Sequence, residues 1–308
     1  MASFSVVALM KEEAAIIRRF VTYYMGLGAE EIFILHDGPI DHLIAADMSP
    51  QKLAEQGVRL HVCDDAFWQR EAGSVPEHLE HRLRAAFGVG HKWCKSDWLL
   101  VCDADEFIID RMPVQIFLGH IPLEIDSVIV FPAEAVWGPD EDISVPFGST
   151  WFRRPVERSR AQNFWLYGPF GFLFRKGLLG HALGKQFVRR GAKFDLIHQH
   201  YAIRDGQRIS VPARRIDPKL AVVELAHFDA ISYDRWYEKF RRPLLNYDPV
   251  AMRERSLRRR IQISLFKWAM RLGGAMPARL CRAFYGLSRR QLRYLQKREE
   301  AFQLRLFD

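Results

Sequence analysis

Short apolar runs alternate with helical patterns over the first 135 residues, and this alternation limits most strongly how the chain can fold. The apolar runs occupy residues 4–10, 31–38, 58–65, 97–105 and 127–137. Between them, apolar residues recur at helical spacing over residues 14–28, 41–56 and 78–93. Buried strands of parallel sheets read as apolar runs, and helices cover both of their faces. The sequence therefore predicts an α/β fold.

Three of the predicted strands end in acidic residues. Asp37 closes the second strand, Asp64 and Asp65 close the third, and Asp103 and Asp105 close the fourth. In open parallel sheets, ligands bind beyond the carboxyl ends of the strands. Acidic residues at three successive strand ends therefore predict a shared ligand site at this edge of the sheet.

The acidic pair at the fourth strand predicts a metal site. Asp103 and Asp105 are two residues apart, so on a strand both carboxylates would point to the same side. Two close carboxylates repel each other, and a divalent cation removes that conflict. Mg²⁺ and Mn²⁺ prefer oxygen ligands and are often held by one or two carboxylates together with substrate phosphates. The pattern therefore predicts a metal-bridged diphosphate.

Several segments together resemble a known family. They are SDWLLVCDADEFI, the Lys11-Glu12-Glu13 start after the first strand, the later Gly184-Lys185, Val188-Arg189 and His198, and the closing ELAHFDAISYDRWYEKFRR, which contains His227. Over about residues 4–242 the chain resembles bacterial glycosyltransferases of the family 2 group, which have the GT-A fold. The similarity is to the branch with a KNE-type start and a DADEF motif. The chain departs from that pattern at HDGPID (36–41), where the family has small hydroxyl residues.

The resemblance implies a Rossmann-like, nucleotide-binding mixed sheet flanked by helices, and a nucleotide-sugar donor. A UDP-sugar is the favoured donor and a GDP-sugar the alternative. Mn²⁺ or Mg²⁺ would be bound by Asp103, Asp105 and His227. The residues expected to bind the donor are Glu12, Asp37, Asp65, Arg82, Lys185 and Arg189. For Arg82, an exposed helix charge is an equal alternative.

A catalytic base is also expected. Inverting transfer, the family expectation, needs a carboxylate that accepts the proton of the acceptor hydroxyl. The carboxylates after the DADEF segment that could serve include Glu134, but the predicted catalytic residues are Glu157, Asp195 and Asp229, with Glu157 slightly preferred. No spacing rule decides between them.

Basic residues concentrate at the C-terminal end. Residues 251–308 contain 15 lysine and arginine residues and 4 acidic residues, a net charge of +11. The whole chain is +8, so residues 1–250 carry −3. In LRRRIQISLFKWAMRL (257–272), apolar residues recur at helical spacing among arginines. Such a helix could lie on an anionic membrane surface or dock on the acidic remainder of the chain. Nucleic-acid binding is disfavoured, because no nucleic-acid fold signature accompanies the charge.

These patterns predict a GT-A domain over residues 1–242, with a nucleotide-sugar-binding half (1–135) and an acceptor half (136–242). A basic amphipathic helical tail follows over residues 243–308. The four cysteines lack metal or redox spacing, which predicts reduced, buried thiols. Neither a signal peptide nor a membrane-spanning helix is expected. The expected location is the cytoplasm, with peripheral attachment to the inner face of the plasma membrane as a further expectation.

The predicted function is metal-dependent transfer of a sugar to a glycan or lipid-linked acceptor, in the assembly of cell-surface polysaccharide. The main alternative is a non-catalytic protein that binds a nucleotide or glycan on the same fold. A glycoside hydrolase is disfavoured, because Asp103 and Asp105 are too close in sequence to flank a glycosidic bond.

Overall fold

The computed structural model describes residues 1–245 and 256–307, and it divides the chain into two compact units. Unit 1 comprises residues 1–131 and 183–225, and unit 2 comprises residues 132–182 and 226–308. These boundaries differ from the predicted ones at 135 and 242, because residues 183–225 return to the first unit. The predicted tail 243–308 belongs to unit 2, and its residues 246–255 and 308 lie outside the described residues.

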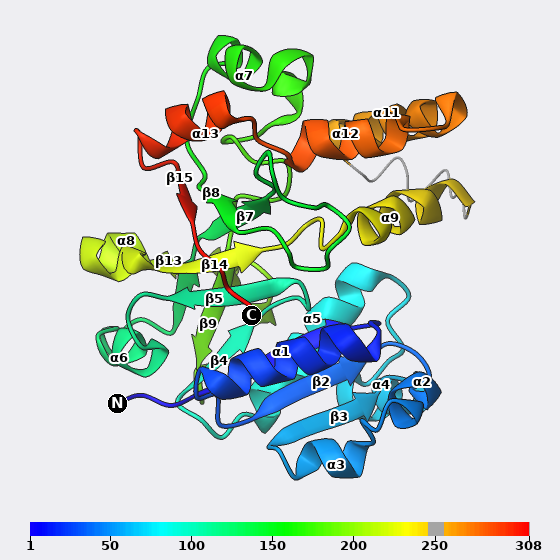
Figure 1. The fold of residues 1–308 in the computed structure, drawn as a ribbon. Coiled ribbons are helices and arrows are strands. Elements are labelled where there is room, and N and C mark those ends of the chain that lie inside the picture. Colours follow the sequence, from blue (N-terminus) through cyan, green and yellow to red (C-terminus); the bar gives the residue numbers. More distant parts are fainter. Residues whose placement is uncertain (246–255, 308) are drawn as a thin grey trace. The chain divides into compact units, whose positions relative to one another are not determined.

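Strands are the centre of unit 1 (Figure 1). They are β1 (Phe4–Met10), β2 (Ile32–His36), β3 (Val58–Val62), β4 (Trp98–Val101), β5 (Glu106–Asp110), β6 (Ser127–Val130), β9 (Lys185–Arg189), β10 (Leu196–Ile197), β11 (Ala202–Arg204), β12 (Gln207–Arg208) and β13 (Val211–Pro212). Among the described residues, one sheet has the order β13-β6-β9-β4-β1-β2-β3. Its strands β1 to β4 run parallel, whereas β9 is antiparallel to both β4 and β6. The predicted α/β class with a mixed sheet is confirmed.

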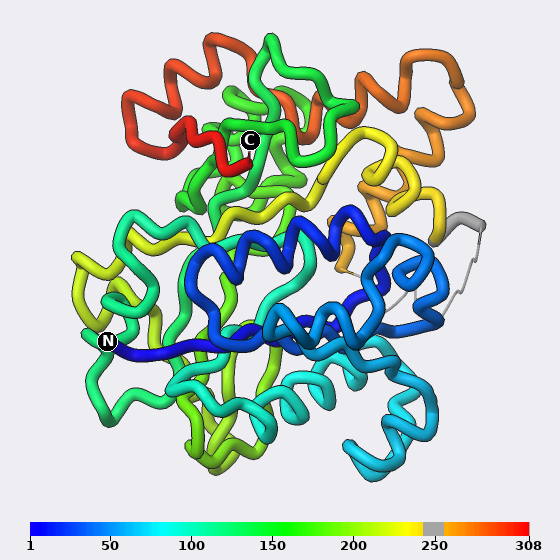
Figure 2. The backbone as a smooth tube through the Cα atoms, turned by 60° about the horizontal axis from the view of Figure 1, so that its bottom comes forward, coloured from blue at the N-terminus to red at the C-terminus, as the bar shows by residue number. Residues whose placement is uncertain are grey.

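Helices cover both faces of this sheet, and Figure 2 shows α1 (Ala14–Gly26) and α5 (Leu79–Trp93) on opposite sides of it. At Gly90 of α5, a Cβ atom would lie 2.6 Å from Cγ2 of Val7 in β1, so only glycine allows this close approach. The other helices of unit 1 are α2 (Asp41–Ala45), α3 (Pro50–Ala54), α4 (Asp65–Ala72), α6 (Val114–Gly119), α8 (Ala213–Ile216) and the 3-10 helix η2 (Pro218–Val222).

Two predicted elements are each divided in the structure. The helix expected over 41–56 is interrupted, because Ser49 caps a new helix, α3, with Pro50 at its first position. The strand expected over 127–137 becomes β6 and β7 (Pro132–Val136), which are separated at Phe131. Pro132 lacks the N–H that would continue the hydrogen-bond ladder.

Unit 2 combines a small antiparallel sheet with a helical core (Figure 1). Its further elements are β8 (Trp151–Arg153), β14 (Val223–His227, which begins in unit 1), β15 (Ala301–Gln303), α7 (Arg160–Tyr167), the 3-10 helix η1 (Gly168–Leu173), α9 (Tyr233–Leu245), α11 (Leu257–Leu272), α12 (Met276–Tyr285) and α13 (Arg289–Gln296). β8 pairs antiparallel with both β7 and β15. The ring of Trp236 in α9 lies 5.2 Å from that of Phe266 in α11. Helices of the basic segment therefore form part of the apolar core of this unit.

None of the described helices has the length and apolarity that crossing a bilayer requires. All four cysteines are buried and free, as the sequence predicts.

Candidate functional site

The candidate site lies at the carboxyl edge of the parallel strands of unit 1. Met10, at the end of β1, is level with His36, at the end of β2, and β4 runs parallel on the other side of β1. Asp37 and the DADEF segment therefore follow β2 and β4, the two parallel strands that lie on either side of β1 in one sheet. This edge is where the strand order predicts a ligand.

The acidic motif forms a turn, which corrects the prediction that its carboxylates share one side of a strand. β4 ends at Val101, and residues 102–105 connect it to β5. The N–H of Asp103 donates to Oε2 of Glu106 at 3.0 Å, and the N–H of Glu106 donates to the carbonyl oxygen of Asp103 at 3.2 Å. The hydroxyl of Tyr24 donates to the carbonyl oxygen of Glu106 at 2.9 Å. The turn is thus held rigidly, with Asp103 and Asp105 partly exposed.

A buried lysine lies against this turn. Nζ of Lys185 is 2.5 Å from Oδ2 of Asp103 and 3.2 Å from Oε2 of Glu106, and Lys185 is fully buried. Burial alone would lower the pKa of Lys185, but the two carboxylates outweigh it and raise that pKa above its ordinary value. The cation therefore stays charged at any physiological pH.

Gly184 explains how Lys185 reaches the turn. It has a φ of +74°, and a Cβ there would lie 2.0 Å from the carbonyl oxygen of Val130 in β6. Only glycine allows the chain to approach β6 so closely before β9 begins. Because β9 pairs antiparallel with β4, its first residue, Lys185, lies beside the end of β4. In this Gly-Lys pair, Gly184 is therefore needed for close packing against β6, and Lys185 contacts the acidic turn.

Asp37 and Arg82 form the second charged group at this edge. Nη1 of Arg82 donates to both carboxylate oxygens of Asp37, at 2.8 and 3.0 Å, and its Nε donates to the carbonyl oxygen of Pro76. Both side chains are about a quarter to a third exposed. The two predicted donor-binding residues therefore meet, and Arg82 is an ion-pair partner of Asp37 rather than a solitary exposed charge.

His198 joins the site through residues that the sequence did not single out. Its Nε2 lies 3.5 Å from Oε1 of Glu80, which also pairs with Arg84. Burial and the charge of Arg84 lower the pKa of His198, although Glu80 opposes them, so the imidazole is neutral at pH 7. His200 binds the carbonyl oxygen of Gly184 at 2.6 Å. Helical period predicted α5, but no sequence signal placed Glu80 and Arg84 next to a residue more than a hundred positions away.

Three predicted site residues of unit 1 make none of the described contacts with the acidic turn, Lys185 or the Asp37–Arg82 pair. Arg189 lies at the opposite end of β9, where it donates to the carbonyl oxygens of Pro122 and Ile125 and covers the ring of Trp98. Asp65 is an exposed residue in the first turn of α4, where acids favour the helix dipole. Asp195 is exposed and accepts from the N–H of Gly206, which closes the β11–β12 hairpin.

Glu12 is the second residue after β1 and is partly exposed. Its carbonyl oxygen bonds the ring of His42 at 3.0 Å. Its predicted contact with the donor stays a prediction.

The remaining predicted residues belong to unit 2. Glu157 is 79 % exposed and pairs with Lys176 at 3.0 Å, and its role as a base stays a prediction. Glu134 is buried, bonds Arg153 at 2.7 Å and accepts the N–H of Gly180 at 2.6 Å, so it is a structural anchor. His227 is buried with its ring 4.6 Å from that of His181, and metal binding by His227 stays a prediction.

Asp229 is held by two partners. Its carboxylate accepts from Nζ of Lys239 at 2.7 Å and from the hydroxyl of Tyr285. Burial would raise the pKa of Asp229, but Lys239, His227 and Arg259 together hold it well below its usual range. A carboxylate stabilised in its charged form is a weak base, so the structure favours a structural role over the predicted catalytic one.

This ion pair predicts a pH dependence. Because the pKa of Asp229 is depressed in the folded state, its stabilisation is present above the unfolded pKa of about 3.9 and is lost as the pH falls through the folded value. We expect Asp229→Asn to lower the free energy of unfolding at pH 7 by about 2 kcal/mol. Between pH 4 and 2 the variant should lose less stability than the wild type. Urea unfolding at pH 7, 4 and 2 measures the free energy of unfolding of both proteins. An equal loss of stability between pH 4 and 2 in the wild type and the variant would contradict the prediction.

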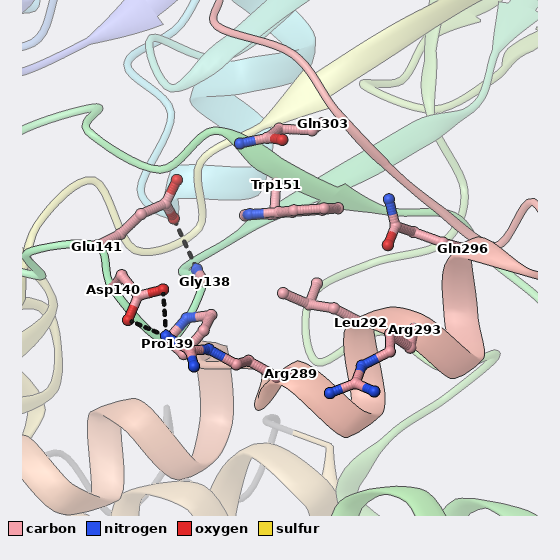
Figure 3. Close-up of a pocket in the computed structure, with 10 residues that line it drawn as sticks. All are labelled: Gly138, Pro139, Asp140, Glu141, Trp151, Arg289, Leu292, Arg293, Gln296 and Gln303. Carbon is pink, nitrogen blue, oxygen red and sulfur yellow. Dashed lines mark hydrogen bonds and ion pairs between the residues drawn. The ribbon is translucent and has the colours of Figure 1, made fainter.

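Unit 2 also contains a pocket of about 380 Å³ (Figure 3). The loop 138–141 forms one wall, and Glu141 holds it by accepting the N–H of Gly138 at 2.6 Å and that of Thr150 at 2.9 Å. Trp151 lies between the loop and one face of α13, with Gln303 above it in the view. From α13, the pocket is lined by Arg289, Leu292, Arg293 and Gln296. An aromatic ring beside amide and guanidinium groups suits a hydroxylated ring such as a sugar.

No family model matches the chain, and no curated protein matches its sequence. Among solved structures, GalNAc-T7 with UDP, GalNAc and Mn²⁺ is similar at a TM-score of 0.37 and 12 % identity, over 74 % of this chain and 44 % of that one. Glucosyl-3-phosphoglycerate synthase from Mycobacterium tuberculosis, in complex with Mn²⁺, UDP and phosphoglyceric acid, is similar at a TM-score of 0.30 and 15 % identity, over 61 % and 56 %. The chain thus spans about half the length of these structures. Likeness at such TM-scores carries no functional argument, and the function rests on the residues of the chain itself.

The acidic turn fits a divalent cation. Asp103, Asp105 and Glu106 bring three negative charges when ionised, and Lys185 brings one positive charge. Among these four side chains negative charge is in excess, which suits a divalent cation such as Mn²⁺ or Mg²⁺. Lys185 engages Oδ2 of Asp103, so Oδ1 of Asp103 and the carboxylate of Asp105 are the oxygen ligands that would hold the ion.

Proposed function

We propose that the chain is a metal-dependent glycosyltransferase that moves a sugar from a nucleotide-diphosphate donor to a glycan or lipid-linked acceptor. The observation that carries the proposal is the carboxyl edge of unit 1. There an acidic turn with a buried lysine follows β4, and Asp37, paired with Arg82, follows β2, the parallel strand on the other side of β1. This edge combines oxygen ligands for a cation with groups that can recognise a charged nucleotide.

Each part of this edge has a role in the proposal. Asp105 and Asp103 would hold the cation, which would serve as a Lewis acid for the departing nucleoside diphosphate. Lys185 keeps the turn from accumulating uncompensated negative charge and fixes the direction of the Asp103 carboxylate. Asp37, oriented by Arg82, would accept hydrogen bonds from the nucleoside. Glu157 as base is a part of the proposal that the pH–rate profile of a Glu157→Gln variant would test. Inversion, the family expectation, is tested by the anomeric configuration of the product.

A nucleotide titration tests the donor site. We expect calorimetry to show Mn²⁺-dependent binding of one nucleotide among UDP, GDP, CMP and dTDP. We expect Asp105→Asn to weaken that binding at least tenfold, or about 1.4 kcal/mol, because it removes a charged oxygen ligand. Asp47→Asn, at a well-exposed aspartate of unit 1, is the matched control and should leave the affinity unchanged.

Two results would count against this proposal. If no nucleotide binds, or if binding is indifferent to both Mn²⁺ and Asp105→Asn, the acidic turn is not the donor site. If a nucleotide binds but the protein neither hydrolyses nor transfers from its sugar conjugate, the non-catalytic binding protein is the better assignment. The altered HDGPID loop is the sequence feature that favours this alternative.

A further inference from the structure

One side of α11 is apolar and open to solvent. Leu257, Trp268 and Leu272 expose 64 %, 53 % and 55 % of their surface, whereas Ile261 and Leu265 are partly buried and pack against the core of unit 2. At about 100° per residue, the three exposed side chains fall on one side of the helix within about 60°. Large apolar residues aligned in this way mark an interaction surface more often than isolated exposed ones do.

The opposite side of α11 is already packed. Ile263, Phe266 and Ala269 are buried in the core of unit 2, together with the ring of Trp236. Ser256 caps the start of the helix by accepting the N–H of Arg259. The helix is therefore fixed within its unit by one face, and intramolecular docking does not account for the apolar side that remains exposed.

Cations flank the exposed apolar side. Arg258, Arg260, Lys267 and Arg271 are exposed, and none of them forms an ion pair with another described residue. Residues 256–298 contain 12 lysine and arginine residues and no acidic residue. The surface that α11 presents is therefore both apolar and positively charged, and residues 256–298 contain no acid that offsets this charge.

We propose that the exposed side of α11 binds the surface of an anionic lipid bilayer, with the helix lying parallel to the membrane. Leu257, Trp268 and Leu272 enter the interface, and the flanking cations contact the headgroup phosphates. Tryptophan favours this boundary because its ring is apolar and its N–H is polar. Nucleic acid would engage the cations but would leave the aliphatic side chains exposed. The inference goes beyond the proposed function and does not depend on it.

Sedimentation with lipid vesicles tests this surface on the full chain. We expect binding to vesicles of equal parts phosphatidylglycerol and phosphatidylcholine, and at least tenfold weaker binding to phosphatidylcholine alone. Neutralising Arg260, Lys267 and Arg271 to glutamine should weaken binding to the anionic vesicles about 100-fold, since each cation near such a surface contributes about a factor of five. Trp268→Ser with Leu272→Ser should weaken it at least about tenfold.

Matched controls remove equal charge and equal apolar surface elsewhere. Arg190, Arg215 and Lys219 are exposed cations of unit 1, and their replacement with glutamine should weaken binding less than threefold. Ile116→Ser with Leu123→Ser is the control for Trp268→Ser with Leu272→Ser, and it should also weaken binding less than threefold. All substituted positions are exposed, and unchanged thermal unfolding confirms that each variant folds.

Three outcomes would overturn the inference. The first is absence of binding to the anionic vesicles, and the second is an equal loss in the α11 variants and their controls. The third is tight binding to a single-stranded oligonucleotide together with no vesicle binding, which would assign the surface to nucleic acid. None of these outcomes bears on the nucleotide titration, so the two proposals can fail independently.

Discussion

Lys185→Met is expected to lower the free energy of unfolding by about 3–5 kcal/mol. Lys185 and Glu106 are fully buried, and the lysine is the cation next to both Glu106 and Asp103. Its removal leaves a buried carboxylate without its ion-pair partner, which is more costly than the original pair. Guanidinium chloride unfolding monitored by circular dichroism measures the change.

The control is the same substitution at an exposed ion pair. Lys52 pairs with Asp47 near the surface, where the side chains are 53 % and 75 % exposed, so Lys52→Met should change stability by less than about 1 kcal/mol. Adding Glu106→Gln to Lys185→Met should recover part of the loss, because it removes the uncompensated charge. A loss below about 1 kcal/mol in the single variant would show that Lys185 is not the counter-charge of the turn.

Arg153→Met is expected to have an effect of similar size in unit 2, about 3–5 kcal/mol. Arg153 and Glu134 are each only 1 % exposed, with Nε of Arg153 2.7 Å from Oε2 of Glu134. The guanidinium also lies 4.8 Å from the centre of the Phe174 ring. The substitution therefore leaves a buried carboxylate whose remaining hydrogen-bond donors, among the residues that the structure describes, are the backbone N–H groups of Leu179 and Gly180.

The exposed Arg289–Asp140 pair provides the control for this second prediction. Its side chains are 71 % and 76 % exposed, so Arg289→Met should cost less than about 1 kcal/mol. Thermal unfolding of the three proteins distinguishes the cases. If Arg153→Met and Arg289→Met destabilise the protein equally, the buried pair is not the anchor of unit 2 that the geometry indicates.

Much of the local structure follows from the sequence. The helix predicted over residues 257–272 has those bounds in the structure, because Ser256 caps its start and Gly273, with positive φ, follows its end. The strand at residues 4–10 is also confirmed. Apolar periodicity and caps are local signals, and where both are present the element forms as predicted.

Where the local signal is incomplete, the structure differs from the prediction. The sequence predicts one strand over 97–105, but the N–H of Glu106 donates to the carbonyl oxygen of Asp103 and closes a turn there. The resemblance places both Lys185 and Arg189 at the donor site. A strand of five residues instead separates them by about 13 Å of chain and places them at opposite edges of the sheet.

By itself the sequence determined the α/β class, the parallel strands whose carboxyl ends meet at one edge, and the acidic residues that follow three of those strands. The sequence determines these features because the spacing of apolar residues and the alternation of strands with helices are local patterns that can be recognised along the chain. Only the tertiary structure decided the partners: Lys185 for Asp103, Arg82 for Asp37, Lys239 for Asp229, and the core for one face of α11. The first two of these pairs join residues 82 and 45 positions apart, and the sequence carries no local trace of such a meeting. Charges of opposite sign are abundant along this chain, so the packing of strands and helices selects which of them share a low-dielectric environment.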